Sequence, residues 1–109
     1  MTPFEKAWAF IQTNLKAGTT INNWTALHGY LGDKMTIAAV RANNIEVDAP
    51  KANSIQVVPK SDFEIVWKVW PEYKALKCKR YELRDMTRFS KYIISIFYWY
   101  EKEEQNGCV

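Results

Sequence analysis

The first apolar pattern along the chain has the period of an α-helix. Thr2 is suited to be the N-cap, Pro3 takes the favoured first helical position, and Glu5 completes a capping box. Gly18 is positioned to end the helix. Large apolar residues then recur on one helical face: Phe4, Trp8, Ile11 and Leu15. The pattern predicts an N-terminal helix with that face against the core.

The next region changes to the period of β-strands. Residues 19–34 mix turn-forming and apolar residues, and we expect an irregular segment or short helical turn there. Beyond it, apolar positions alternate at residues 37–40, 45–48 and 55–58, as in strands with one buried face. The stretches ANN and DAPKAN supply turn residues between them. These patterns predict a three-stranded antiparallel meander.

A second helical pattern begins near residue 61. Ser61 and Glu64 have capping-box spacing. One stripe then holds four apolar residues: Phe63, Val66, Trp67 and Trp70. Pro71 disfavours a helical residue before it and cannot donate to the preceding turn, so we expect a kink or break there.

The most apolar stretch is YIISIFYWY, at residues 92–100. As a strand it would need cover on both faces, which a chain of 109 residues can scarcely supply. We therefore predict a helix from about Arg88, with Ile94 and Tyr98 opposite its main apolar face. That main face holds six residues: Phe89, Tyr92, Ile93, Ile96, Phe97 and Tyr100. Because the main face would fill the core, we predict that Ile94 and Tyr98 lie in a homo-oligomer interface.

Together these elements predict one α+β domain over residues 1–109. It would comprise an N-terminal helix, a three-stranded antiparallel meander and two C-terminal helices packed on one face. A hydrophobic content of 48% with 25% charged residues argues against disorder.

The compartment predicted from the sequence is the cytoplasm. MTPFEKAWAF lacks the basic lead and apolar run of a signal peptide, and no apolar run approaches the roughly 20 residues that span a bilayer. We therefore expect no membrane partner, and we expect Cys78 and Cys108 to be unbonded.

Positive charge gathers in residues 60–91, where nine Lys and Arg residues outnumber five Asp and Glu residues. Five of the cations are spaced as on one helical stripe: Lys77, Arg80, Arg84, Arg88 and Lys91. Such a stripe can neutralise phosphates, which would suit a nucleic-acid-binding module. The alternative is a solvated surface paired with Glu82 and Asp85, in a segment that equally suits an extended connector.

Residues for catalysis are sparse. His28 is the one histidine, no nucleophile motif or Gly-rich phosphate loop occurs, and metal-ligand spacing is absent, so we expect neither metal nor cofactor. Neighbouring cations could make Cys78 a reactive thiolate, but the sequence favours an ordinary half-exposed thiol in a basic stretch. A small-ligand pocket is a further possibility, and its candidate lining residues are Trp24, His28, Trp67 and Trp70. The alternative for these tryptophans is the core.

The small size, the aromatic-rich core closed by helices and the absence of a catalytic signature resemble the orphan α+β proteins encoded by mobile gene cassettes of integrons. The resemblance implies frequent self-assembly and carries over no site residues. The sequence therefore favours a cytoplasmic, non-enzymatic binding protein that self-associates through its aromatic C-terminal helix. The alternatives are a nucleic-acid-binding module using residues 77–91, and a small-ligand protein or unrecognised enzyme with an aromatic pocket.

Overall fold

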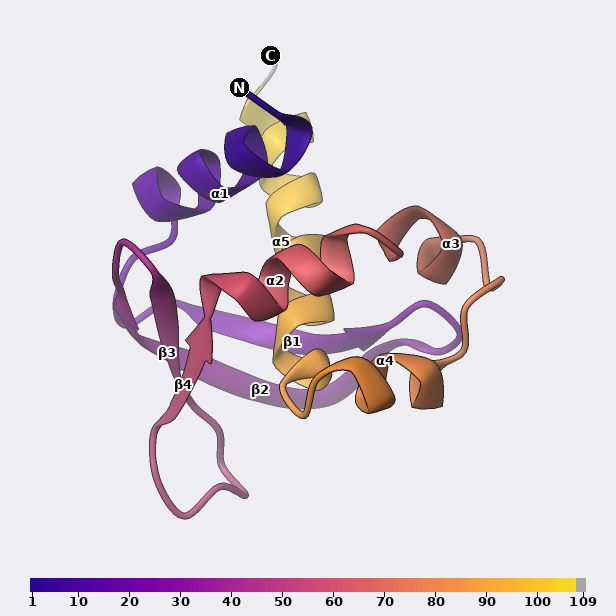
Figure 1. The fold of residues 1–109 in the computed structure, drawn as a ribbon. Coiled ribbons are helices and arrows are strands. Elements are labelled where there is room, and N and C mark those ends of the chain that lie inside the picture. The colour runs from indigo at the N-terminus through magenta and orange to yellow at the C-terminus, as the bar shows by residue number, and fades with distance from the viewer. Residues whose placement is uncertain (108–109) are drawn as a thin grey trace.

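The computed structural model describes residues 1–107 and confirms the α+β class. The elements follow in the order α1 (Pro3–Asn14), β1 (Thr20–Thr25), β2 (Gly29–Val40), β3 (Asn44–Asp48), β4 (Gln56–Pro59), α2 (Lys60–Trp67), α3 (Trp70–Lys74), α4 (Arg80–Met86) and α5 (Ser90–Gly107). The strands form one antiparallel sheet in the order β1-β2-β3-β4, and the connection between β3 and β4 extends as a long loop away from α1 (Figure 1).

The N-terminal helix begins as predicted, because its start signals are local, but it ends at Asn14 rather than at Gly18. The Thr2 side-chain hydroxyl accepts a hydrogen bond from the Glu5 backbone N–H at 3.1 Å, and Pro3 begins α1. The predicted apolar face is buried, with Trp8 2% exposed and Ile11 fully covered. The Trp8 indole N–H donates to the Ala42 carbonyl at 3.1 Å, which ties the helix to the β2–β3 turn.

The sheet has four strands, one more than predicted. The additional strand is β1, in the segment expected to be irregular, and it pairs Ile21 with Met35 of β2. Its register shifts beyond Asn22, so that Asn23 alone faces residues 31–33 of β2. Gly32 allows this bulge because its φ of +94° lies in the left-handed region.

The C-terminal half contains four helices where two were predicted. The break at Pro71 is confirmed, since α3 begins anew at Trp70. The capping box predicted at Ser61 does not form: the N-cap position lies two residues earlier, at Pro59, and no side chain caps the helix. The predicted apolar stripe is confirmed for Phe63, which is fully covered.

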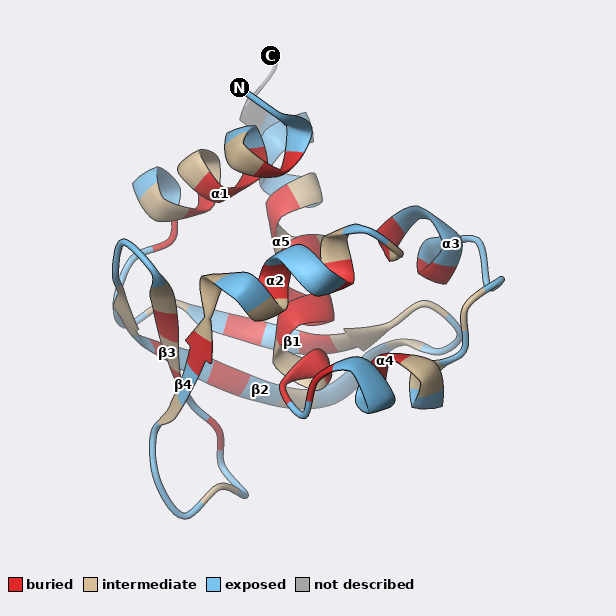
Figure 2. Ribbon diagram, viewed as in Figure 1, coloured by how far each residue is buried: buried red, intermediate tan, exposed pale blue. Residues whose placement is uncertain are grey.

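Helix α5 is the centre of the core and explains the most apolar stretch. It packs against β1 and also contacts α1, α2 and α4, so its middle is buried on every side (Figure 2). Ile94 is 1% exposed. Tyr98 stacks on Trp24 with ring centroids 4.1 Å apart and meets the edge of Tyr30 at 5.7 Å.

The interface prediction for Ile94 is therefore wrong, because the chain itself covers that side chain. Tyr98 is half-buried and engaged within the chain, so it is no free anchor for a second subunit. Helix α5 also provides a hydrogen-bond acceptor for the edge strand β1, since the Trp24 backbone N–H donates to the Ser95 hydroxyl at 3.0 Å. Self-association itself stays a prediction.

Candidate ligand-binding pocket

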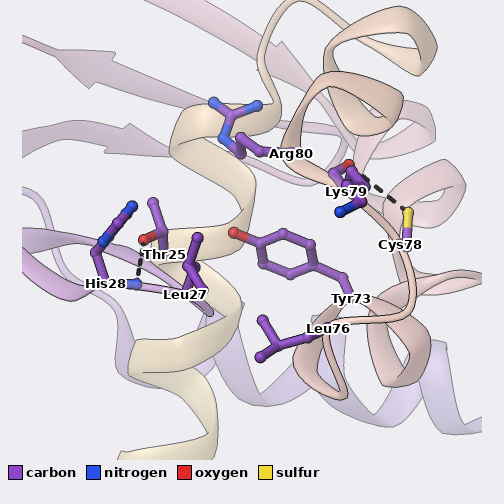
Figure 3. A pocket seen from close by; sticks show the side chains of 8 residues that line it. All are labelled: Thr25, Leu27, His28, Tyr73, Leu76, Cys78, Lys79 and Arg80. Carbon is purple, nitrogen blue, oxygen red and sulfur yellow. Dashed lines mark hydrogen bonds between the residues drawn. The ribbon is translucent and has the colours of Figure 1, made fainter.

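A cavity of about 300 Å³ lies between the β1–β2 hairpin turn and the connection from α3 to α4. We call it the hairpin pocket, and Figure 3 shows the eight side chains that line it: Thr25, Leu27, His28, Tyr73, Leu76, Cys78, Lys79 and Arg80. Apolar carbon surface from Leu27, Tyr73 and Leu76 is combined there with a few polar groups, which is the usual make-up of a small-molecule site.

The hairpin side of the pocket is held by a side-chain turn. The Thr25 hydroxyl accepts a hydrogen bond from the His28 backbone N–H at 3.1 Å, and Gly29 completes the turn with a φ of +70°. This arrangement leaves the Leu27 side chain 70% exposed at the tip of the hairpin. Leu27 and His28 therefore form an accessible rim.

Tyr73 connects the helical side of the pocket to the hairpin. Its ring is buried, and its hydroxyl accepts the Ala26 backbone N–H at 3.1 Å. Burial raises the pKa of Tyr73, so the hydroxyl stays protonated at neutral pH and keeps a proton to donate. In Figure 3 this hydroxyl points toward the hairpin residues Thr25 and Leu27.

Leu76 lines the pocket in a strained conformation. Helix α3 ends in a Schellman motif, in which the Leu76 N–H donates to the Tyr73 carbonyl at 3.0 Å and the Lys77 N–H to the Glu72 carbonyl at 2.8 Å. Leu76 occupies the left-handed position of this motif, with a φ of +63°, where glycine is the usual residue. A left-handed backbone costs a residue with a side chain about 1–2 kcal/mol. A leucine is thus held at the wall of the pocket against a local energetic preference.

Lys79 and Arg80 both bring positive charge to the pocket, and Arg80 is the half-buried cation of the two. One guanidinium N–H donates to the Ser90 hydroxyl at 2.7 Å, which fixes the side chain between α4 and α5. Burial lowers the pKa of Arg80, with the neighbouring Arg84 cation acting in the same direction. Within residues 1–107, no carboxylate forms a salt bridge with Arg80. A half-buried cation without a counter-ion favours an anion nearby.

The surroundings of Cys78 favour the protonated thiol over the thiolate. Burial raises its pKa, and the Glu82 and Glu72 carboxylates raise it further, so the neighbouring cations do not produce a thiolate. Its sulfur is a weak donor to the Lys79 carbonyl at 3.9 Å. Cys108 lies outside the described residues, so the absence of a disulfide between the two cysteines stays a prediction.

Of the four residues predicted to line a pocket, His28 alone lines the hairpin pocket. The three tryptophans pack among other aromatic rings instead. Trp24 stacks on Tyr98, and Trp67 meets Phe97 edge-on at 5.3 Å. Trp70 is 2% exposed, and its indole N–H donates to Glu101 at 3.2 Å. The core alternative holds for these side chains.

The predicted basic stripe does not lie on one helix. Helix α4 carries Arg80 and Arg84, but it ends because Thr87 is extended, with a φ of −156° and a ψ of 138°. The Thr87 hydroxyl donates to the Asp62 carboxylate at 2.7 Å and accepts the Phe89 backbone N–H at 3.1 Å, which stabilises the break before α5.

The remaining cations of the basic stretch separate accordingly. Lys77 precedes α4, and Arg88 lies in the break with its guanidinium 4.6 Å from the Phe89 ring centroid. Lys91 belongs to α5, where its ammonium is 3.7 Å from the Asp33 carboxylate. The single-stripe prediction is wrong, and nucleic-acid binding by these residues stays a prediction.

Comparisons with protein-family models, curated proteins and solved structures found no match to this chain. Across residues 1–107, no helix has the length and apolar character to cross a bilayer. The same residues contain no cluster of three or more His, Cys, Asp or Glu side chains suited to a metal ion.

Proposed function

We propose that this protein binds a small organic anion with an apolar body in the hairpin pocket. The observation that carries the proposal is the half-buried Arg80 guanidinium, which meets no carboxylate of residues 1–107 and lies at the wall of an apolar cavity. An anionic ligand would supply the missing counter-charge, and its bond to a guanidinium would be charge-assisted.

The size of the pocket supports a compact ligand. Its volume of about 300 Å³ is at the lower end for small-molecule sites, which suits a molecule built on one ring or a short branched chain. The Tyr73 hydroxyl adds a donor inside the cavity, and Leu27 and Leu76 would cover the apolar body. The strain at Leu76 also supports a binding role, because strained residues gather at functional sites.

Benzoate is a suitable probe, because it is a one-ring carboxylate, and benzamide is its uncharged counterpart of the same shape. We expect isothermal titration calorimetry to detect benzoate binding and little or no heat from benzamide. Losing a charge-assisted hydrogen bond costs about 1.5–3 kcal/mol, so Arg80→Gln should weaken benzoate binding by roughly tenfold or more.

Arg84→Gln is the matched control, since Arg84 is exposed on the same helix and lies outside the pocket lining. It should change benzoate affinity by less than about twofold, because an exposed charge away from the ligand contributes little. Equal binding of benzoate and benzamide, or equal losses in the two arginine variants, would contradict the proposal. Failure to bind benzoate at millimolar concentration would also count against it.

A further inference from the structure

A second candidate site lies between α1, the start of β1 and the C-terminal half of α5, and it shares no lining residue with the hairpin pocket. It consists of two hollows, of about 660 Å³ and about 150 Å³, and both are lined by Trp99 and Glu103, so they adjoin. Helix α1 packs against α5 at this end of the molecule (Figure 1). We call the two hollows together the α1–α5 groove.

Trp99 differs from the other four tryptophans of the chain. Each of those four stacks on or meets the edge of another aromatic ring, whereas Trp99 does neither within residues 1–107. Its side chain is half-buried and lines both hollows. Phe10 lines the larger hollow and Tyr98 the smaller one, and both are also half-buried. Each hollow therefore offers accessible aromatic surface.

Polar side chains that a ligand can reach surround this aromatic surface. Asn14 follows Phe10 by one turn of α1, and its side-chain N–H donates to the Phe10 carbonyl at 2.9 Å, which holds the amide beside the ring. Glu103 follows Trp99 by one turn of α5. The edge strand β1 contributes Asn22 to the smaller hollow. All three polar side chains are exposed, so their oxygen atoms are accessible from the groove.

The charges of the groove favour a neutral ligand. Across the described residues, no cation forms a salt bridge with the Glu103 carboxylate. The Lys102 ammonium lies 5.3 Å from the centroid of the Tyr98 ring, to which it is attracted electrostatically. With one charge of each sign and several amides, the groove suits hydroxyl groups, which both donate and accept hydrogen bonds.

We propose that the α1–α5 groove binds a neutral carbohydrate of at least two sugar rings. The C–H groups on one face of a sugar ring are attracted to the negative face of an aromatic ring. Its hydroxyl groups bind carboxylates and amides, whose planar groups can meet two neighbouring hydroxyls at once. Trp99 is shared by the two hollows, so a ligand that fills both needs one ring for each. The larger volume lies within the range of small-molecule sites.

The test is a titration of the complete protein followed by proton–nitrogen correlation NMR. The probes are three neutral disaccharides: cellobiose, maltose and lactose. Glucose supplies a single sugar ring, and cyclohexanol supplies an apolar ring with one hydroxyl. We expect saturable shifts of the Trp99 indole N–H and the Glu103 amide signals with at least one disaccharide at millimolar concentration. Glucose and cyclohexanol should bind roughly tenfold more weakly, because each loses ring contacts or hydrogen bonds.

Variants separate the aromatic contribution from the polar one. Trp99→Ala should weaken disaccharide binding by about tenfold, whereas Trp99→Phe keeps an aromatic ring, protects the fold and should bind more tightly than Trp99→Ala. Glu103→Ala should weaken binding by about two- to tenfold, the loss expected for a hydrogen bond. Glu104→Ala is the matched control, since Glu104 is exposed on the same helix and lines neither hollow; it should change the affinity by less than about twofold.

Three results would overturn this inference. The absence of a saturable response to all three disaccharides would exclude a carbohydrate site. A response to cyclohexanol as strong as that to the disaccharides would indicate an apolar hollow alone. Equal affinities in Glu103→Ala and Glu104→Ala would show that the polar rim does not contact the ligand. Benzoate binding in the hairpin pocket should be unchanged in Glu103→Ala, so this inference and the proposed function can fail separately.

Discussion

Replacing Leu76 with glycine and, separately, with alanine distinguishes backbone strain from side-chain contact at the wall of the hairpin pocket. In an ordinary helix, glycine is about 0.5–1 kcal/mol less stable than alanine. At the φ of +63°, alanine keeps the left-handed cost of about 1–2 kcal/mol, whereas glycine does not. The difference leaves Leu76→Gly more stable than Leu76→Ala by up to about 1.5 kcal/mol, a reversal of the usual order.

Urea denaturation followed by tryptophan fluorescence measures this difference, because both variants remove the same side-chain contacts and differ chiefly in the backbone. Both should also bind benzoate more weakly than the parent, since each opens the apolar wall. If Leu76→Ala is the more stable of the two, the left-handed conformation at this position is refuted. If benzoate binding is unchanged in both, Leu76 has no part in the site.

Three further predictions concern burial and protonation. Ile94→Ala should lose about 2–5 kcal/mol of stability, and its unfolding midpoint should not depend on protein concentration, whereas Ile65→Ala, at an exposed position, should lose far less. An unfolding midpoint that depends on protein concentration would indicate that Ile94 lies in an interface between subunits. Glu82→Gln should lower the pKa of Cys78 and speed its alkylation at fixed pH, and an unchanged rate would contradict the cause given for the raised pKa. Burial raises the pKa of Tyr100, so its contribution to stability should be intact below the unfolded pKa of about 10 and be lost as the pH rises above it. The free energy of unfolding of Tyr100→Phe should therefore fall less steeply with pH in alkali than that of the parent, and an equally steep fall would show that Tyr100 is not responsible.

Local signals were sufficient to predict the start of α1, its buried face and the break at Pro71. A cap residue, a proline and a helical apolar period act within a few residues of one another, so they can be recognised without the rest of the fold. Strand β1 was missed because its pairing is not local. Its two asparagines weaken the strand pattern, and the bulge at Asn23 depends on residues 31–33 of the partner strand.

The second face of α5 shows a different limit. The sequence indicates that Ile94 is apolar, but it does not indicate what covers it. Strand β1 packs on one side of α5 and helices α1, α2 and α4 pack on other sides, so the chain buries more than one face of this helix. Considering α5 as an isolated helix with one core face therefore led to the prediction of a partner subunit, which burial of Ile94 does not require.

Most of the hairpin pocket could not be predicted for a similar reason. It joins residues 25–28 to residues 73–80, about fifty positions apart, and the backbone conformation of Leu76 leaves no trace in the sequence. His28 was predicted to line a pocket and does line this cavity, whereas Arg80 was predicted to belong to a phosphate-binding stripe and lines the same cavity. The tryptophans were wrongly predicted to line a pocket, because large aromatic residues fill cores at least as often as pockets.

Mapping benzoate on the protein by proton–nitrogen correlation NMR tests the proposed binding function most directly. We expect saturable shifts concentrated on the amides of Leu27, Leu76 and Arg80, with benzamide producing little change and Arg80→Gln removing the benzoate response. Shifts spread over other surfaces, or an equal response to benzoate and benzamide, would contradict an anion-binding pocket between the hairpin and α4.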